Sequence, residues 1–251
     1  RIEAIPHLTY AEGFVGMGGV FFRRRFAPRA EVINDRSRDV ATFFRVPQRH
    51  YQAFLDEMKW KLSSRAEFER LMAVDPDTLT DLERSARFYY LQQLAFGGKV
   101  AGRNYGVAVA SPSRFNIVRL ATELQEIHER LSSVTIENLD FEAFIDRYDA
   151  PETLFYFDPP YWDSEKDYGK DLFGKADFTR LAARLRTIEG NFLLSINDTH
   201  GVRDRDHGDP GPHALADPSG FPRDPDRAIP QHERGCEPAF QVGRDRGKSA
   251  R

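Results

Sequence analysis

The sequence predicts an α/β fold in which a doubly wound, mostly parallel sheet carries an inserted helical domain. Short apolar runs that fit strands alternate with segments of helical periodicity along most of the 251 residues, a pattern typical of parallel sheets. The run at 154–157, LFYF, is apolar throughout, as in a strand buried on both faces. The stretch 60–131, between the second and third predicted strands, is far longer than a crossover needs and indicates the insertion.

Composition and charge limit the class of protein. Hydrophobic residues make up 40% and charged residues 30% of the chain, which fits a soluble globular protein. The net charge of -3 gives no global basic signature, so any contact with nucleic acid would be a local patch. The single cysteine, Cys236, excludes an internal disulfide and a multi-cysteine metal site. The sequence shows neither a membrane-spanning run nor a signal peptide, so we expect a cytoplasmic protein.

The first predicted strand, at 8–11, leads into a glycine-rich turn and then into a helix that we expect to start at 20–22. Gly16, Gly18 and Gly19 would let the backbone pass close to a bound molecule and adopt positive φ. A strand, a glycine turn and a helix together make a ligand-binding unit. A plain flexible turn is the alternative, and the sequence is not a Walker A loop.

The second predicted strand, at 30–33, ends in Asn34 and Asp35. An acidic residue about 20 residues after a glycine loop suits hydrogen bonding to a ribose diol. Asp35 also suits the start of the next helix, over 38–58, as a capping residue, and the two roles are compatible. Pro47 should break or kink that helix because it lacks an N–H group.

Helices are predicted within the insertion at 64–73, 79–96 and 113–131. The helix over 79–96 starts with a capping box made by Thr80 and Glu83. Its aromatic face around Phe88 fits core packing better than a platform for stacking bases. A loop with four glycines, Lys99 and Arg103 follows. That loop suits gripping phosphates, and a solvated hairpin is the alternative.

Two further strands end in motifs that can carry chemistry, and a fifth strand is predicted at 191–196. The third strand, at 135–137, leads into Asn138-Leu139-Asp140-Phe141, and the fourth into Asp158-Pro159-Pro160-Tyr161. The prolines end the fourth strand because neither donates to a ladder and each fixes φ. A carboxylate and a tyrosine are thus held on a stiff turn at the edge where open α/β sheets bind ligands. An ordinary strand end followed by a surface turn is the alternative.

The composition changes after about residue 200. Residues 201–251 contain 7 of the 15 prolines and 7 of the 18 glycines, with many Asp and Arg. Such a composition does not bury a core. We therefore expect an irregular, disordered tail.

Four blocks of the sequence, taken in order, resemble the Dam-type adenine-N6 DNA methyltransferases, particularly those of phages and restriction systems. The blocks, within about residues 8–200, are Phe14-Val15-Gly16-Met17-Gly18, Ile33-Asn34-Asp35, Asn138-Leu139-Asp140-Phe141 and Asp158-Pro159-Pro160-Tyr161. The run Phe88-Tyr89-Tyr90-Leu91, followed by Phe96-Gly97-Gly98, resembles the family's DNA-recognition insertion. One block would be weak evidence, whereas all of them in the family's order are specific.

The resemblance implies a Rossmann-like methyltransferase sheet, S-adenosylmethionine as methyl donor, no metal, and double-stranded DNA as the partner whose flipped adenine is methylated. It assigns cofactor binding to Phe14, Gly16, Gly18, Asp35, Asp140, Phe141 and Asp158. It assigns catalysis to Asp158, Pro159, Pro160 and Tyr161, and makes Lys99 and Arg103 candidates for phosphate contacts. Asp140 would accept a hydrogen bond from the cofactor's adenine, and a helix N-cap is its alternative role. The oligomeric state stays open, a monomer included.

The resemblance also divides the chain into a catalytic domain (1–59 and 132–200), a recognition insertion (60–131) and the tail. The chain departs from the family at Gly13, where proline is usual, and it lacks a Pro-Gly-Gly-Lys block ahead of Arg1. These departures and the tail support an alternative, an inactive truncated or frameshifted remnant that at most binds DNA or cofactor. Transfer to cytosine N4 is a lesser alternative, because the motif's Asp158 and the insertion favour adenine.

Overall fold

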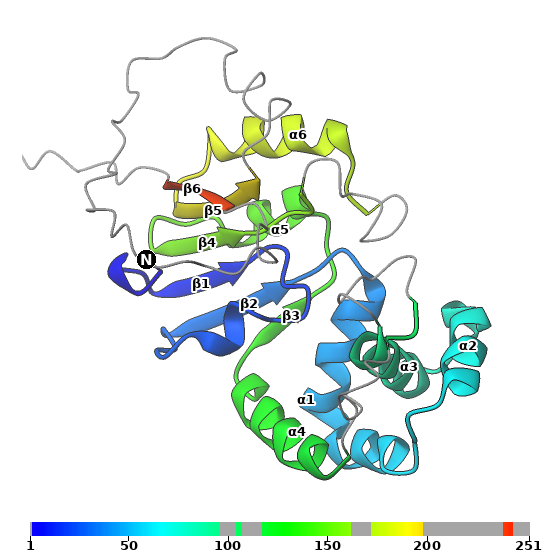
Figure 1. Ribbon diagram of the computed structural model, residues 1–251. Coiled ribbons are helices and arrows are strands. Elements are labelled where there is room, and N and C mark those ends of the chain that lie inside the picture. The colour runs from blue at the N-terminus through cyan, green and yellow to red at the C-terminus, as the bar shows by residue number, and fades with distance from the viewer. Residues whose placement is uncertain (1, 96–103, 107–116, 162–171, 198–237, 243–251) are drawn as a thin grey trace, which may run out of the picture.

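The computed structural model describes residues 2–95, 104–106, 117–161, 172–197 and 238–242. Its strands are β1 (Thr9–Glu12), β2 (Ala30–Asn34), β3 (Thr135–Glu137), β4 (Thr153–Phe157), β5 (Asn191–Asn197) and β6 (Pro238–Val242). They form one sheet in the order β3-β2-β1-β4-β5-β6 (Figure 1). The first five strands pair in parallel, and β6 pairs antiparallel with β5. The predicted α/β class and parallel sheet are confirmed.

The strand order reverses direction beside β1. The chain builds outward from β1 through β2 to β3 and then returns to place β4 on the other side of β1. In parallel open sheets, a crevice opens at the carboxyl ends of the strands where the order reverses. The predicted glycine turn, Asp35 and Asp158 all follow the carboxyl ends of β1, β2 and β4.

Helices cover both faces of the sheet, as a doubly wound fold requires (Figure 1). The α-helices are α1 (Arg38–Met58), α2 (Arg65–Ala73), α3 (Asp81–Leu94), α4 (Ile117–Leu131), α5 (Phe141–Tyr148) and α6 (Lys175–Leu185). One apolar cluster joins alternate strand residues such as Tyr10 and Leu154 to α1, α3 and α4. The other joins Phe155 and Phe157 to α5 and α6. All five residues of β4 are buried, because the two clusters sandwich it.

The helices α1 to α4 pack on one another at one side of the sheet (Figure 1). The capping box of α3 is present, with Thr80 and Glu83 each bonding the other's backbone N–H. Phe88, Tyr89 and Leu91 are buried, which confirms that they belong to the core. The kink in α1 falls at His50, whose φ of -131° is not helical, rather than at Pro47.

The helix expected after the glycine turn is wrong. Only a single 3-10 turn, η2 (Phe21–Arg23), forms there. The helical turn ends because the Arg24 side chain points inward. Its guanidinium carbon lies 3.5 Å from the centroid of the Tyr10 ring, and its Nη1 pairs with Glu31 Oε1 at 2.6 Å. A side chain anchored in this way holds the backbone on a direct path into β2.

The tail is not irregular throughout. Residues Pro238–Val242 form β6 on the outer edge of β5. A proline at the first position of an edge strand costs no ladder hydrogen bond, and β5 offers an edge whose backbone groups need partners. The rest of the predicted tail lies outside the described residues.

Glu31 supplies a prediction about stability. Its carboxylate, 3% exposed, pairs with Arg24 at 2.6 Å and with Arg130 at 2.5 Å. We expect Glu31→Ala to lower the free energy of unfolding by about 3–5 kcal/mol, because Arg24 would remain buried without its carboxylate partner. Glu67→Ala, which breaks an exposed pair with Arg70, should cost below about 1 kcal/mol. Urea unfolding of both variants tests this, and equal losses would contradict it.

Candidate active site

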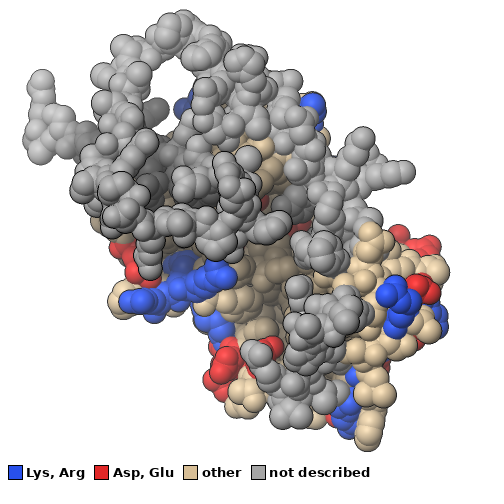
Figure 2. Space-filling model, in the orientation of Figure 1, with Lys and Arg blue, Asp and Glu red and all other residues tan. Residues whose placement is uncertain are grey.

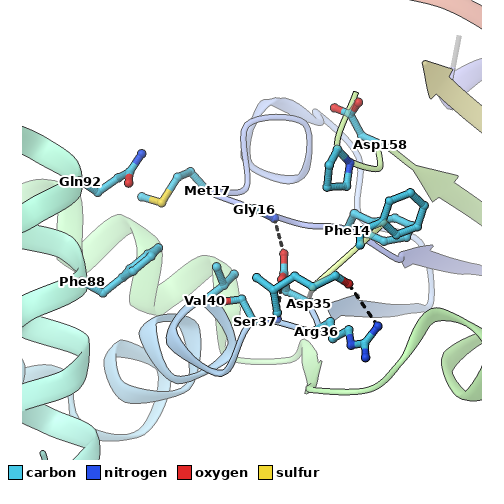
Figure 3. Close-up of a pocket in the computed structure, with 13 residues that line it drawn as sticks. Phe14, Gly16, Met17, Asp35, Arg36, Ser37, Val40, Phe88, Gln92 and Asp158 are labelled. Carbon is cyan, nitrogen blue, oxygen red and sulfur yellow. Dashed lines mark hydrogen bonds between the residues drawn. The ribbon is translucent and has the colours of Figure 1, made fainter. Parts of the chain in front are cut away.

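A pocket opens at the carboxyl ends of β1, β2 and β4, where the strand order reverses (Figure 3). It is lined by Phe14, Gly16, Met17, Asp35, Arg36, Ser37, Val40, Phe88, Gln92, Asp158, Pro160, Leu172 and Phe173. The wall is mostly apolar, with one carboxylate on the β2 side and another on the β4 side. Small-molecule sites commonly combine an apolar wall with a few convergent polar groups.

The glycine turn forms the β1 side of the pocket. Gly16 and Gly18 have φ of +51° and +73°, which favour glycine. At Gly16, a Cβ atom would meet nothing within 4 Å, so the backbone borders open space. At Gly18, it would lie 2.6 Å from the Phe22 ring, so the turn also packs too closely for a side chain. The positive φ predicted for Gly16 and Gly18 is confirmed, whereas the prediction for Gly19 is wrong, because its φ is not positive.

Gly13, the position where the sequence departs from its resemblance, has its own role. Its N–H donates to the Tyr156 carbonyl at 2.9 Å, a bond that proline cannot make. A Cβ atom at this position would lie 2.6 Å from the Phe157 ring. Glycine therefore fits both the hydrogen bonding and the packing here.

The carboxylate of Asp35 is held by two backbone donors. Gly16 N donates to Oδ2 at 3.0 Å, and Ser37 N donates to Oδ1 at 2.8 Å. Each carboxylate oxygen has two acceptor positions, so each retains one for a ligand. Burial raises the pKa of Asp35 to about 6, and the two backbone hydrogen bonds oppose that rise. The geometry suits two neighbouring hydroxyl donors.

Asn34 joins three segments beneath the pocket. It is 1% exposed, and its Nδ2 donates to the carbonyls of Gly13 at 3.0 Å and Leu139 at 3.1 Å. Its Oδ1 accepts from the Leu139 N–H at 2.8 Å. One side chain thus ties the start of the glycine turn and the β3–α5 connection to the end of β2. The sequence motif contained Asn34, but no pattern predicted this role.

Asp158 lies on the opposite side of the pocket from Asp35 (Figure 3). Burial raises the pKa of its carboxyl group, while a hydrogen bond from Ser195 opposes the rise. At the end of β1, the buried Glu12 accepts a hydrogen bond from the Tyr10 hydroxyl at 2.6 Å. Burial is the main cause that raises the pKa of Glu12 to about 8, and the charge of Asp158 adds to it.

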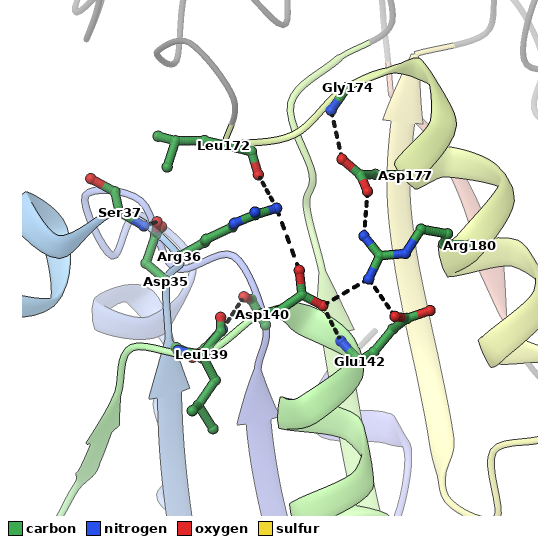
Figure 4. Close-up of polar contacts among 12 residues, drawn as sticks. Asp35, Arg36, Ser37, Leu139, Asp140, Glu142, Leu172, Gly174, Asp177 and Arg180 are labelled. Carbon is green, nitrogen blue, oxygen red and sulfur yellow. Dashed lines mark hydrogen bonds and ion pairs between the residues drawn. The ribbon is translucent and has the colours of Figure 1, made fainter.

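Asp140 and Phe141 lie beside the pocket rather than in its lining. Asp140 caps α5 by accepting from Glu142 N at 3.0 Å, so the alternative role predicted for it is present. It also pairs with Arg36 at 3.4 Å and Arg180 at 3.2 Å (Figure 4). Phe141 is buried against Phe14, with ring centroids 6.1 Å apart. It supports the pocket's aromatic wall from behind.

The structure therefore brings together Phe14, Gly16, Asp35, Asp158 and Pro160 around one pocket. Gly18 shapes the turn, and Pro159 and Tyr161 continue from Asp158. Lys99 and Arg103 lie outside the described residues. Phe88, predicted as core, also lines the pocket, and the sequence did not single out the remaining lining residues: Met17, Arg36, Ser37, Val40, Gln92, Leu172 and Phe173. Only proximity to the motifs could have indicated the first four, and no local signal marks Gln92.

Three further properties of the described residues bear on the kind of site: metal-ligand clusters, membrane-spanning helices and surface charge. Within them, no three His, Cys, Asp or Glu side chains gather as a metal site would require. None of the described helices combines the length and apolar character needed to span a membrane. On the face shown in Figure 2, the visible Lys and Arg side chains form separate groups with acidic groups between them. No broad basic surface is visible there, in keeping with the net charge of -3.

The doubly wound sheet and a pocket at its switch point define a ligand-binding α/β protein. Comparison with known proteins narrows this class. Residues 2–205 match the model of the D12 class N6 adenine-specific DNA methyltransferases. The type II methyltransferase M.MjaIII of Methanocaldococcus jannaschii is 25% identical over 204 residues, covering 72% of this chain and 69% of that protein. The type II methyltransferase M1.LlaDCHI of Lactococcus lactis subsp. cremoris is 24% identical over 223 residues, covering 78% of each.

The chain belongs to the D12 class N6 adenine-specific DNA methyltransferase family, since the match covers most of its length. The predicted family is thereby confirmed. The protein is an adenine-specific DNA methyltransferase whose methyl donor is S-adenosylmethionine and whose substrate is DNA.

Asn34 supplies the prediction for this site. Asn34→Ala would leave buried groups of Gly13 and Leu139 without partners, at about 1–3 kcal/mol for each unsatisfied group. We expect the free energy of unfolding to fall by about 2–4 kcal/mol and S-adenosylmethionine to bind more weakly. Asn138→Ala, which removes exposed hydrogen bonds to Asp35 and Arg36, serves as the control. Urea unfolding and calorimetry measure both effects, and similar results for the two variants would refute the assigned role.

Proposed function

We propose that the pocket between Asp35 and Asp158 is the S-adenosylmethionine site. The observation that carries this proposal is the Asp35 carboxylate, which retains one free acceptor position on each oxygen while two backbone N–H groups hold it. A ribose presents two neighbouring hydroxyl donors to such a group. The open space beside Gly16 leaves the backbone accessible to the amino acid part of the ligand.

The aromatic wall supports the placement of an adenine ring. Phe14 and Phe173 meet edge to face, with centroids 5.3 Å apart, and both line the pocket. Phe141 packs behind them, and Asp140 holds Arg36 at the pocket edge. We propose that Phe14 and Phe173 contact the adenine and that Phe141 acts through them. Asp140 is proposed to contribute through Arg36 and through its cap on α5.

Asp158 is the proposed catalytic carboxylate. The lone pair of adenine N6 is delocalised into the ring, so the amine needs reorientation more than a strong base. Asp158 would accept one N6–H bond and the Pro159 carbonyl the other, which turns the lone pair toward the methyl group. When bound, S-adenosylmethionine would supply that methyl group from its positively charged sulfur, which leaves as a neutral thioether, and the surplus N6 proton would pass through Asp158 to solvent. The two prolines preorganise both acceptors, so alignment provides most of the acceleration.

The DNA is proposed to be double-stranded, with the target adenine turned out of the helix. Tyr161 follows Pro160 directly and would stack on the flipped base, which offsets an unstacking cost of a few kcal/mol. The helices of 60–131 pack beside the pocket and contribute Phe88 and Gln92 to it. We propose that this segment is the recognition insertion of a catalytic domain formed by 1–59 and 132–200. Lys99 and Arg103 remain the proposed phosphate contacts.

The role of Asp158 is tested by substitution. Asp158→Asn removes the charged acceptor and presents an amide whose donor side cannot accept N6–H. We expect methylation to fall by about 10²-fold or more, with S-adenosylmethionine affinity much less affected. Mass spectrometry of N6-methyladenine in DNA from expressing cells is the measurement, with the exposed Asp146→Asn variant as control. Equal methylation by wild type and Asp158→Asn would exclude Asp158, and absent methylation in wild type would favour an inactive remnant.

The raised pKa of Asp35 predicts that the affinity for S-adenosylmethionine depends on pH. Ribose hydroxyls donate to the ionised carboxylate, and burial raises its pKa to about 6 in the free protein. Binding should therefore be strongest above pH 6 and weaken as the pH falls, approaching about tenfold per pH unit well below the pKa. Calorimetric titration with S-adenosylmethionine between pH 5 and 7 measures this. Asp35→Asn should bind weakly without the dependence, and a flat wild-type profile would contradict the assignment.

A further inference from the structure

The register of β4 and β5 brings a buried serine beside the proposed catalytic carboxylate. Tyr156 pairs with Leu193, and the next residue of β4 pairs with Leu194. Continuing this parallel register by one residue places Asp158 beside Ser195. Side chains alternate between the faces of a strand, so both project to the face that carries Tyr156. Ser195 is 2% exposed, which keeps its hydroxyl from being satisfied by bulk water.

The Ser195 hydroxyl interacts with more than one polar side chain. Its partners are the Asp158 carboxylate and the hydroxyls of Tyr156 and Tyr161. A serine hydroxyl has one proton to donate and two positions that accept. An ionised carboxylate can only accept, so the Ser195 hydroxyl donates its hydrogen bond to Asp158. The serine oxygen keeps two acceptor positions for other donors, so its contacts with Tyr156 and Tyr161 do not compete with the bond to Asp158.

We propose that Ser195 is a positioning residue for methyl transfer, in which one oxygen atom orients Asp158 and links it to Tyr161. The inference rests on the proposed role of Asp158 as acceptor of the adenine amine. It goes beyond that role because it assigns the orientation of the carboxylate to a strand outside the Asp158-Pro159-Pro160-Tyr161 motif. Asp158 and the aromatic side chain that would stack on the base thereby share one anchor.

The charged and titratable groups around Ser195 agree with this role. Glu12 at the end of β1, Tyr156 on β4 and Tyr161 on the turn are titratable groups that interact with Asp158, and burial favours the neutral form of each. Asp35 lies across the pocket. A hydrogen bond donated to the ionised form of a carboxyl group favours that form. The Ser195 proton therefore opposes the effect of burial, which raises the pKa of Asp158.

A titration without turnover provides the first test. Carbon-13 shifts of aspartate carboxyl groups are followed against pH in wild type and Ser195→Ala, and Asp158→Asn identifies the resonance of Asp158. We expect its pKa to rise by about one pH unit in Ser195→Ala, because the ionised form loses a donor. Ser85→Ala is the matched control: Ser85 is fully buried, and its hydroxyl has no partner among the described residues. An unchanged Asp158 titration in Ser195→Ala would overturn the proposal.

The pH dependence of methylation provides the second test. In Ser195→Ala, kcat at pH 7 should fall about tenfold and the acidic limb should move to higher pH by about one unit, while KM for S-adenosylmethionine stays near the wild-type value. Ser195→Thr keeps a hydroxyl and should restore the wild-type limb. A merely structural role would lower the stability of Ser195→Ala without moving the limb, and that result would count against the proposal. If wild type itself transfers no methyl group, the proposed function fails, whereas the carboxyl titration still decides the role of Ser195.

Discussion

The parallel pairing of β1 with β2 on one side and with β4 on the other determines where the glycine turn, Asp35 and Asp158 lie. Near the carboxyl ends of these strands, Glu12 of β1 pairs with Ile33 of β2 on one side and with Tyr156 of β4 on the other. Three segments far apart in the sequence therefore leave the sheet at one edge, and the chain reversal beside β1 opens a pocket between them. The two packed faces that bury β4 keep this edge rigid, which preorganised chemistry requires.

Charge inside this site is stabilised by fixed dipoles rather than by opposite charges. Asp35 is held by backbone N–H groups and Asp158 by a hydroxyl, whereas the arginines near the sheet are engaged elsewhere, Arg24 with Glu31 among them. Burial raises the pKa of both aspartates, and these neutral donors oppose the rise. Such carboxylates keep acceptor positions for a ligand, which a bidentate arginine would occupy.

Periodicity and motifs predicted the first five strands, the parallel sheet and the two carboxylates of the pocket, Asp35 and Asp158, because each depends on local sequence. The predicted helix after Gly18 was wrong, since the path of that segment depends on the contact of Arg24 with Tyr10 and Glu31. The strand at 238–242 was missed because an exposed sheet edge, not composition, makes it pair. The contacts of Asn34 and Ser195 involve residues distant in sequence, and no one-dimensional pattern reports them.

The central claim is that three separate segments form one cofactor pocket with the catalytic carboxylate on its border. A crystal structure with S-adenosylhomocysteine, the demethylated product, tests it most directly. The account predicts ribose hydroxyls on both oxygens of Asp35, adenine against Phe14 and Phe173, and sulfur directed toward Asp158. A ligand bound away from Asp35, or with its sulfur directed away from Asp158, would contradict it.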